Sequence, residues 1–522
     1  MRFLSLAVAA VLAAASAGAG AQELRLAIAA PATSMDPQFY NAAPNNTVAV
    51  HFFDRLTNRT PDAGLEPWLA QSWTAVSDTI WEFKLRPGVK WHDGENFTAD
   101  DVAFSLARAP SVPNSPGGFG GFLRAIARVE VIDPLTIRLH MKAPSPNQPN
   151  DLATVAIISR KHGAGAATED YNSGKAMIGT GPYRFTRFIA GDRVEMARND
   201  SWWGPKPAWE RVNFRFIPNS AARTAALLAG DVDLIDVPPA ADLPRLREDK
   251  GLAVVSTQGL RVIYLVPDFS RTGEVTFITD NAGNKLDKNP LLDPRVRRAL
   301  SLAINRQGLA ERVMQGTASA TGQWLPAGTF GYNPDVKPPV FDAEGAKKLL
   351  AEAGFPQGFK ITLHTPNDRY PNDAATAQAV AQMWSRIGVQ TQVEALPWAS
   401  YAGRGAKQEW SIGLWGWGSG TAEAGYTLIN VIGTFDRALG RGTSNHGRYS
   451  NPAIDGLTDT ALSTLNDGGR EKLLRQGVAM AMDDNAFIPL YQLTNFWAHK
   501  KTIIVTPRAD DGTRAFEVRP AR

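Results

Sequence analysis

The stretch KLRPGVKWHDGENFTADDV, Lys84–Val102, gives the clearest local structural prediction in the sequence. It completes a run over 81–85 in which large apolar and charged residues alternate with the period of a half-buried strand. The letters PG and HDG that follow are turn signals. Thr98, with Asp101 three residues later, forms a capping box and predicts a helix over 99–108. The stretch therefore predicts a strand, two turns and a capped helix.

The first half of the mature chain carries several strand signals. Alternating residues predict strands at 24–28 and 211–216, and hairpins over 129–141 and 179–196. A helix is expected over 221–229, and Gly230, which follows it directly, predicts its end.

The later part of the chain alternates longer helices with short strands. Helices are expected after Asp293 and over 342–354, and the run 361–393 predicts a strand, a helix and a parallel strand. Near the end, FIPLYQ and NFWAHK predict strands that return to an earlier sheet. The run 361–393 is therefore suited to parallel strand pairing.

Composition narrows the class of protein. The 522 residues, 44% hydrophobic and 20% charged, are typical of a globular protein and too many for one simple core, so two or more lobes are expected. The net charge of +4 is small and dispersed over 55 basic and 51 acidic side chains, which argues against a nucleic-acid or membrane-surface partner.

The N-terminal residues predict export. A positive start, a short apolar run and the small residues AGAGA predict a signal peptide over 1–21 that is cleaved before Gln22. The sequence has no cysteine, which removes disulfides, thiolate metal sites, thiol nucleophiles and a lipid-bearing cysteine. We therefore expect a freely diffusing periplasmic protein that is not lipid-anchored.

No catalytic or cofactor motif is evident. The seven histidines are widely separated and form no local zinc pattern, and no serine stands in a GxSxG elbow. Asp100-Asp101 could act as paired carboxylates, but their position at a helix start favours capping. We expect no catalytic residue, no metal and no cofactor. An exported hydrolase or peptidase, or a periplasmic chaperone, stays open as an alternative class.

The segment WSIGLWGWGSGTAE, Trp410–Glu423, is the strongest candidate for a binding element. It predicts a strand that delivers a glycine-rich loop to a cleft, where Trp415 and Trp417 offer stiff, flat surfaces to a ligand. A core strand that ends in an ordinary turn is the alternative. The loop lacks the spacing of a phosphate-binding loop.

Beyond these patterns, the sequence resembles the family-5 extracellular solute-binding proteins of ABC importers, the dipeptide, oligopeptide, nickel and glutathione group. The resemblance rests on Lys84–Val102 and on further motifs in the family's order: SMDP, EPWLAQSW, IGTGPYRF, NDSWWGPKP, LLAGDVDLID, DPRVRRALSLAINR, FDAEGAKKLLAEAGF, RYSNPAIDGL and IPLY. It implies a two-lobed α/β type II periplasmic binding protein fold, with mixed sheets, a hinge and a ligand cleft. Lobe I would cover 22–259, completed by 488–522, and lobe II 260–487.

The resemblance also implies a function. The protein would be a monomeric receptor that captures a small peptide or peptide-like solute, such as a dipeptide, an oligopeptide or a glutathione-like molecule, and delivers it to permease subunits. Nickel chelates, opines and oligosaccharides stay open, because this family changes its substrate on one scaffold.

Candidate ligand contacts follow from the same resemblance. In peptide-binding members a Trp on the second-lobe loop is followed by an Asp that pairs with the peptide ammonium. Here Trp417 matches the Trp, but Gly420 stands where the acid would be, and the nearest carboxylate is Glu423. The residues expected near the ligand are Ser34, Met35 and Asp36 on lobe I, and Trp398, Arg404, Trp415, Trp417, Ser419, Thr421 and Glu423 on lobe II.

Overall fold

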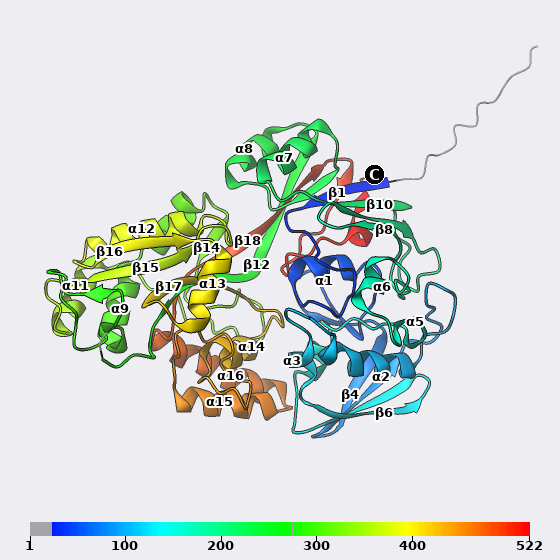
Figure 1. Ribbon diagram of the computed structural model, residues 1–522, viewed down its shortest axis with the longest axis horizontal. Helices are drawn as coiled ribbons and strands as arrows, with labels where there is room; N and C mark the ends of the chain where they lie inside the picture. The colour runs from blue at the N-terminus through cyan, green and yellow to red at the C-terminus, as the bar shows by residue number, and fades with distance from the viewer. Residues whose placement is uncertain (1–22, 274, 522) are drawn as a thin grey trace, which may run out of the picture.

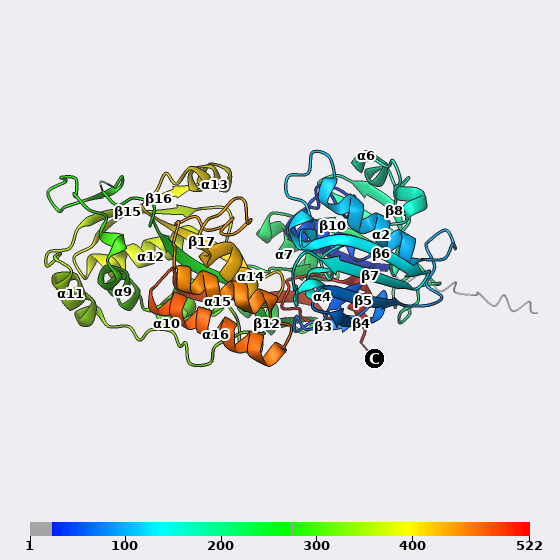
Figure 2. The same cartoon turned by 90° about the horizontal axis from the view of Figure 1, so that it is seen from below.

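A computed structural model describes residues 23–273 and 275–521, and the predicted signal peptide lies outside them. The molecule has two α/β bodies that lie side by side (Figures 1 and 2). We call the body with both the early strands and the C-terminal residues lobe I, and the other lobe II. Within the described ranges, no helix combines the length and the apolar character needed to cross a bilayer.

A mixed sheet of twelve strands runs through both lobes, in the order β13-β15-β17-β12-β18-β11-β1-β10-β9-β8, with β14 on β18 and β16 on β15. Its strands are β1 Glu23–Ile28, β8 Tyr183–Ile189, β9 Arg193–Arg198, β10 Arg211–Phe216, β11 Leu234–Asp236, β12 Leu252–Pro267, β13 Ile278–Thr279, β14 Ala318–Ala320, β15 Lys360–Pro366, β16 Gln390–Leu396, β17 Ile412–Gly418 and β18 Ile488–Lys500.

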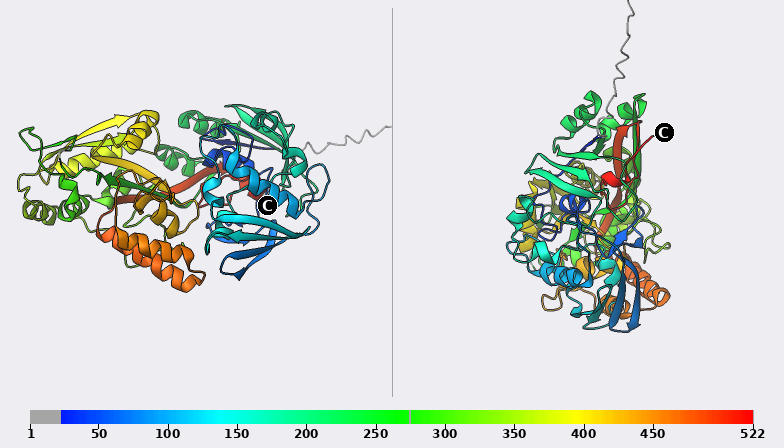
Figure 3. Two further views of the ribbon diagram at one scale, coloured as in Figure 1. Left: turned by 60° about the horizontal axis from the view of Figure 1, so that its bottom comes forward. Right: turned by 90° about the vertical axis from the view of Figure 1, so that its right-hand side faces the viewer.

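Two long antiparallel strands, β12 and β18, connect the lobes (Figure 3). Residues 252–258 of β12 pair with 494–500 of β18, and residues 262–265 pair with 488–492. The register shifts between Gln258 and Val262, and such an irregularity bends a strand pair. The two lobes are therefore joined at a bend in continuous strands.

A smaller sheet, β4-β5-β7-β6, extends lobe I and packs with α2. Its strands are β4 Ala70–Ser77, β5 Ile80–Leu85, β6 Ile126–Asp133 and β7 Thr136–Met141, and the pairs β2 Thr57–Arg59 with β3 Leu65–Pro67 and β19 Ile503–Ile504 with β20 Arg519–Pro520 are separate. Phe83 and Ile137, on adjacent strands, and Val102, on α2, are fully buried together. The alternation in 81–85 thus places its apolar residues toward a helix-covered core.

The α-helices are α1 Ala43–Ala49, α2 Ala99–Arg108, α3 Gly120–Leu123, α4 Gln148–Asp151, α5 Arg160–Gly163, α6 Thr168–Asn172, α7 Ser220–Ala229, α8 Leu243–Glu248, α9 Pro294–Leu302, α10 Arg306–Gly308, α11 Ala343–Glu352, α12 Asp373–Ser385, α13 Trp398–Lys407, α14 Ala424–Thr427, α15 Pro452–Ser463 and α16 Asp467–Asp483.

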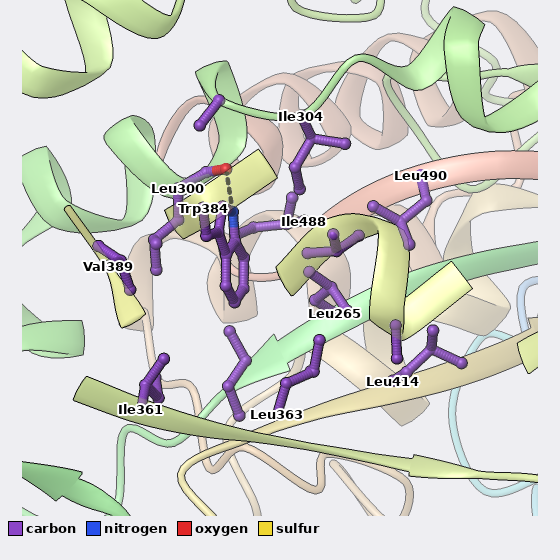
Figure 4. Close-up of a cluster of buried hydrophobic side chains, with 14 of the residues drawn as sticks. Leu265, Leu300, Ile304, Ile361, Leu363, Trp384, Val389, Leu414, Ile488 and Leu490 are labelled. Atoms are coloured by element: carbon purple, nitrogen blue, oxygen red, sulfur yellow. Dashed lines mark hydrogen bonds between the residues drawn. The ribbon is translucent and has the colours of Figure 1, made fainter. Parts of the chain in front are cut away.

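The core of lobe II forms around Trp384 of α12 (Figure 4). Its indole N–H donates to the Leu300 carbonyl at 2.9 Å, and the ring packs among fully buried aliphatic side chains from several strands. Along the chain, β15 precedes α12 and β16 follows it, and the two strands pair in parallel. The predicted strand, helix and parallel strand over 361–393 are therefore confirmed.

The other element predictions are also confirmed, with one correction. The predicted strands, hairpins and capped helices in the first half correspond to β1, β6–β7, β8–β9, β10, α2 and α7. The two segments FIPLYQ and NFWAHK, however, belong to one strand, β18. Polar residues between them do not end the strand, because β12 and β14 satisfy its backbone along its length.

The capping box of α2 gives a stability prediction. The Asp101 carboxylate accepts from the Thr98 N–H at 3.0 Å, from the Trp91 indole at 3.2 Å and from the Arg160 N–H at 2.9 Å. We expect Asp101→Ala to destabilise the protein by about 1–2 kcal/mol in chemical denaturation. Asp100→Ala is the matched control, since Asp100 is exposed, and we expect a change within about 0.5 kcal/mol. Equal effects of the two substitutions would contradict the capping role.

Candidate ligand-binding cleft

A cavity of about 300 Å³ lies between the two lobes. Lobe I lines it with α1 and with the C-terminal segment 509–514, and lobe II lines it with residues 260–261 of β12 and with the loop 418–420. Pockets for small molecules typically start at this volume. Because both lobes form the walls, movement of one lobe relative to the other would expose or enclose a bound solute.

The cavity carries an excess of arginine. Arg55, Arg59, Arg261 and Arg514 line it, against only two carboxylates, Asp510 and Asp511. Arg59 donates to backbone carbonyls, and Arg514 donates to the Asn58 side chain at 3.1 Å. The guanidinium groups of Arg55 and Arg261, in contrast, have no hydrogen bond or ion pair to any residue in 23–273 or 275–521.

Arg55 is the more unusual of these two arginines, because its side chain is only 8% exposed. Burial lowers the pKa of its guanidinium to about 9, and the charge of Arg514 acts in the same direction. The neighbouring Asp54 does not pair with it: its carboxylate accepts from the indole N–H groups of Trp68 and Trp203. Arg55 is therefore a buried cation next to the cavity that forms no ion pair with a carboxylate of the described residues.

The two adjacent aspartates have different environments. Asp510 accepts two hydrogen bonds from Arg508, both at 2.9 Å. Asp511 lines the cavity, and its carboxylate has no hydrogen bond or ion pair within the described part of the chain. The Asp510 carboxylate is thus held by Arg508, whereas the Asp511 carboxylate is available to a ligand.

The glycine-rich loop after β17 forms a wall of the cavity, as predicted from its sequence. Gly418, Ser419 and Gly420 line it. The Trp417 ring lies behind the wall, where it stacks on Tyr426 with a centroid distance of 5.3 Å and donates its N–H to Thr427 at 2.9 Å. Trp417 therefore supports the wall, and Tyr426 lines the cavity together with Phe122 of lobe I.

The next residues of the loop line a second interlobe cavity, of about 500 Å³. Glu423 lies there in a buried ion pair with Arg470 at 2.5 Å, and burial raises the pKa of its carboxyl. The Thr421 carbonyl accepts from the Asn150 amide of lobe I at 2.9 Å. Thr421 and Glu423 are thus at the lobe interface, but apart from the arginine-rich cavity.

Ser34, Met35 and Asp36 do not line either cavity. The Ser34 hydroxyl bonds to Asn172, Met35 packs in the lobe I core, and Asp36 forms an ion pair with Arg108 at 2.7 Å. All three are at most 4% exposed. The predicted ligand contacts at this motif therefore have structural partners, and the site proposed below does not include them.

An aromatic cluster contains Trp398 and Trp415, and Arg404 lies on the same helix as Trp398. Trp415 is 5% exposed, stacks on His446 and contacts Trp398, with ring centroids 5.6 Å apart. Arg404 pairs with Glu394 at 2.7 Å. None of the three lines the arginine-rich cavity. For Trp415 the structure agrees with the core-strand alternative.

Sequence reasoning missed Arg55, Arg261 and Asp511. They come from segments far apart in the chain, and no local pattern distinguishes them from surface charges. What the three residues share is that their charged groups form no hydrogen bond or ion pair with the described residues, and this is evident only in the folded structure. No group of three or more His, Cys, Asp or Glu residues within 23–273 and 275–521 is placed to hold a metal ion.

The fold and the cleft define the class of protein. Two α/β lobes, joined by crossing strands and enclosing a cavity, are the architecture of the type II periplasmic binding proteins. The chain belongs to the bacterial extracellular solute-binding proteins of family 5: the profile described as "Bacterial extracellular solute-binding proteins, family 5 Middle" matches residues 64–437. It is thus a solute-binding protein of an ABC importer, a receptor and not an enzyme.

Known relatives cover nearly the whole chain. It is 28% identical to heme-binding protein A of Haemophilus influenzae, over 89% of this chain and 85% of that protein. It is also 28% identical to the glutathione-binding protein GsiB of Escherichia coli (strain K12), over 92% and 91%. Among solved structures, the periplasmic binding protein DppA of Helicobacter pylori, in complex with the peptide STSA, has a TM-score of 0.78 at 25% identity and covers 96% of this chain and 98% of that one.

Proposed function

We propose that this receptor captures a small peptide or peptide-like solute with at least one free carboxylate. The observation that carries the proposal is the pair of unpartnered guanidinium groups, Arg55 and Arg261, one from each lobe, on a single cavity. Arginine binds carboxylates through two parallel hydrogen bonds. A solute carboxylate between the lobes would neutralise both cations only when the lobes are closed, which couples binding to closure.

The size and chemistry of the cavity support a short ligand. A volume of about 300 Å³ suits a dipeptide or tripeptide better than a long chain. Glutathione is a tripeptide-like molecule with two carboxylates, and an arginine excess suits it. The relative that is named for binding glutathione and the structural neighbour that holds a peptide support the same chemical class.

The remaining features of the proposal concern the organisation and location of the protein. We place the lobe boundaries at 259/260 and 487/488, and the register shift of the crossing strands between Gln258 and Val262 supports the first of them. The protein would act as a periplasmic monomer, exported by its N-terminal segment, and the closed form would dock on permease subunits in the inner membrane.

A thermal-shift panel tests this proposal. It compares di- and tripeptides and glutathione with the same peptides carrying a C-terminal amide, and includes opines, nickel chelates and sugars. We expect stabilisation by the peptides with a free carboxylate, of about 2.7 kcal/mol at one hundred times the dissociation constant, and a much smaller effect of the amides. Stabilisation by none of the peptides or glutathione, or hydrolysis of a peptide, would contradict the proposal.

A further inference from the structure

The turn Asp510-Asp511-Gly512 presents one carboxylate to the interlobe cavity and secures the other. Asp511 has a φ of 57°, in the left-handed region, and its N–H donates to the Arg508 carbonyl at 3.3 Å. The Gly512 N–H donates to the Asp510 carboxylate at 3.2 Å. Asp and Asn tolerate this backbone conformation better than most residues. The turn therefore fixes the direction of the Asp511 side chain without using its carboxylate.

The charges around Asp511 come from three separate elements. Asp510 is its neighbour on the turn, Arg261 lies on β12, and Arg369 lies between β15 and α12. Burial within the cleft raises the pKa of Asp511 to about 6, and the Arg261 charge acts in the opposite direction. No ion pair within 4 Å joins Asp511 to either arginine, in the residues that the structure describes. Asp511 and Arg261 thus line one cavity without forming an ion pair, and Arg369 acts on Asp511 through its charge from outside the residues that line it.

We propose that Asp511 binds the ammonium group of the solute, while the free arginines bind its carboxylate. An unpartnered carboxylate inside a ligand cavity favours a cation, and a primary ammonium supplies the three donors that its oxygens accept. The class of ligand is therefore a peptide or amino-acid derivative that has both a free amine and a free carboxylate. This assignment rests on the proposed function, and it places amine recognition on lobe I, outside the glycine-rich loop of lobe II.

The position of Gly420 is consistent with this assignment. It lines the same cavity as Asp511 and carries no side chain that could bind an amine. The acid of the same loop, Glu423, is only 2% exposed and is paired with Arg470. Among the residues that line the arginine-rich cavity, the acidic ones are Asp510 and Asp511, and Asp510 is already bound to Arg508.

The test compares a peptide with its N-acetylated form on the wild type and on Asp511→Asn, by isothermal titration calorimetry. Asn fits the left-handed backbone, so the variant is expected to fold, and a melting curve checks this. We expect the wild type to prefer the free amine by tenfold or more, and Asp511→Asn to bind both forms with similar, weaker affinity. Asp78→Asn, on the exposed turn between β4 and β5, is the matched control and should keep the preference.

A pH series gives a second readout. The affinity of the wild type for the free-amine peptide should fall by up to tenfold per pH unit below about pH 6, because protonation removes the charge of Asp511. Asp511→Asn should show a flat profile between pH 5 and 7. If peptides bind but Asp511→Asn keeps the preference for the free amine, the assignment of Asp511 is wrong while the proposed function stands. If no peptide binds, the proposed function itself fails.

Discussion

Arg55→Gln is expected to weaken solute binding about 100-fold while leaving the protein as stable as the wild type, or more stable. A factor of 100 is about 2.7 kcal/mol, within the range measured when one partner of an enclosed charge pair is truncated. The loss is large because the Arg55 guanidinium is buried and has no partner among the described residues, so a solute carboxylate would bind a poorly solvated charge that no other carboxylate neutralises. Isothermal titration calorimetry with the ligand found in the panel measures it.

The stability expected of Arg55→Gln follows from the same geometry. No described carboxylate loses a partner when Arg55 is replaced, because Asp54 is satisfied by indole and hydroxyl donors. The substitution also removes repulsion from Arg514, which contributes to the lowered pKa of Arg55. A residue that binds ligand at a cost in stability is common at functional sites.

Two further variants separate the functional role of Arg55 from a structural one. Arg55→Lys keeps the charge but loses the planar fork, so an intermediate affinity is expected. Arg295→Gln, an exposed arginine of lobe II that pairs with Asp293, should leave the affinity unchanged. Unchanged affinity in Arg55→Gln, or a loss of affinity that accompanies unfolding, would refute the role of Arg55.

The local structure of this chain could be predicted well from its sequence. The strand before Pro87 and the capped helix α2 follow from alternation and from the Thr98 and Asp101 pair, both of which act within a few residues. The parallel unit β15-α12-β16 follows from periodicity in the same way. Such signals are local, so the sequence contains all that is needed to interpret them.

Long-range features were predicted less completely. The continuity of β18 through polar residues depends on β12 and β14, which pair with it from distant parts of the chain. The free charges Arg55, Arg261 and Asp511 depend on which other charges find partners, and that is decided only by the fold. Conversely, Ser34 and Asp36 were expected to lie near the ligand. In the structure the Ser34 hydroxyl bonds to Asn172, and Asp36 forms an ion pair with Arg108.

Arg508→Met is expected to destabilise the protein by about 3–5 kcal/mol, the range for breaking a buried ion pair from one side. Arg508 is 1% exposed, and its guanidinium joins the Asp510 carboxylate, the Glu517 carboxylate at 2.8 Å and the Arg59 carbonyl at 2.8 Å. The substitution leaves two acids and a carbonyl without this donor. Urea denaturation at pH 7 measures the loss.

The pH dependence of this loss provides an internal check, with Arg128→Met as the control. Burial alone would raise the pKa of Asp510, but the Arg508 and Arg514 charges hold it at about 2, below its usual 3.8. A carboxyl whose pKa is lower in the folded state than in the unfolded state stabilises the folded state at pH values above its unfolded pKa. This contribution is lost as the pH falls through the folded-state pKa. The difference between wild type and Arg508→Met should therefore shrink between about pH 4 and pH 2. Arg128 pairs with Glu130 on the surface, so its substitution should change stability by no more than about 0.5 kcal/mol, and an equal effect of both would show that Arg508 is no structural hub.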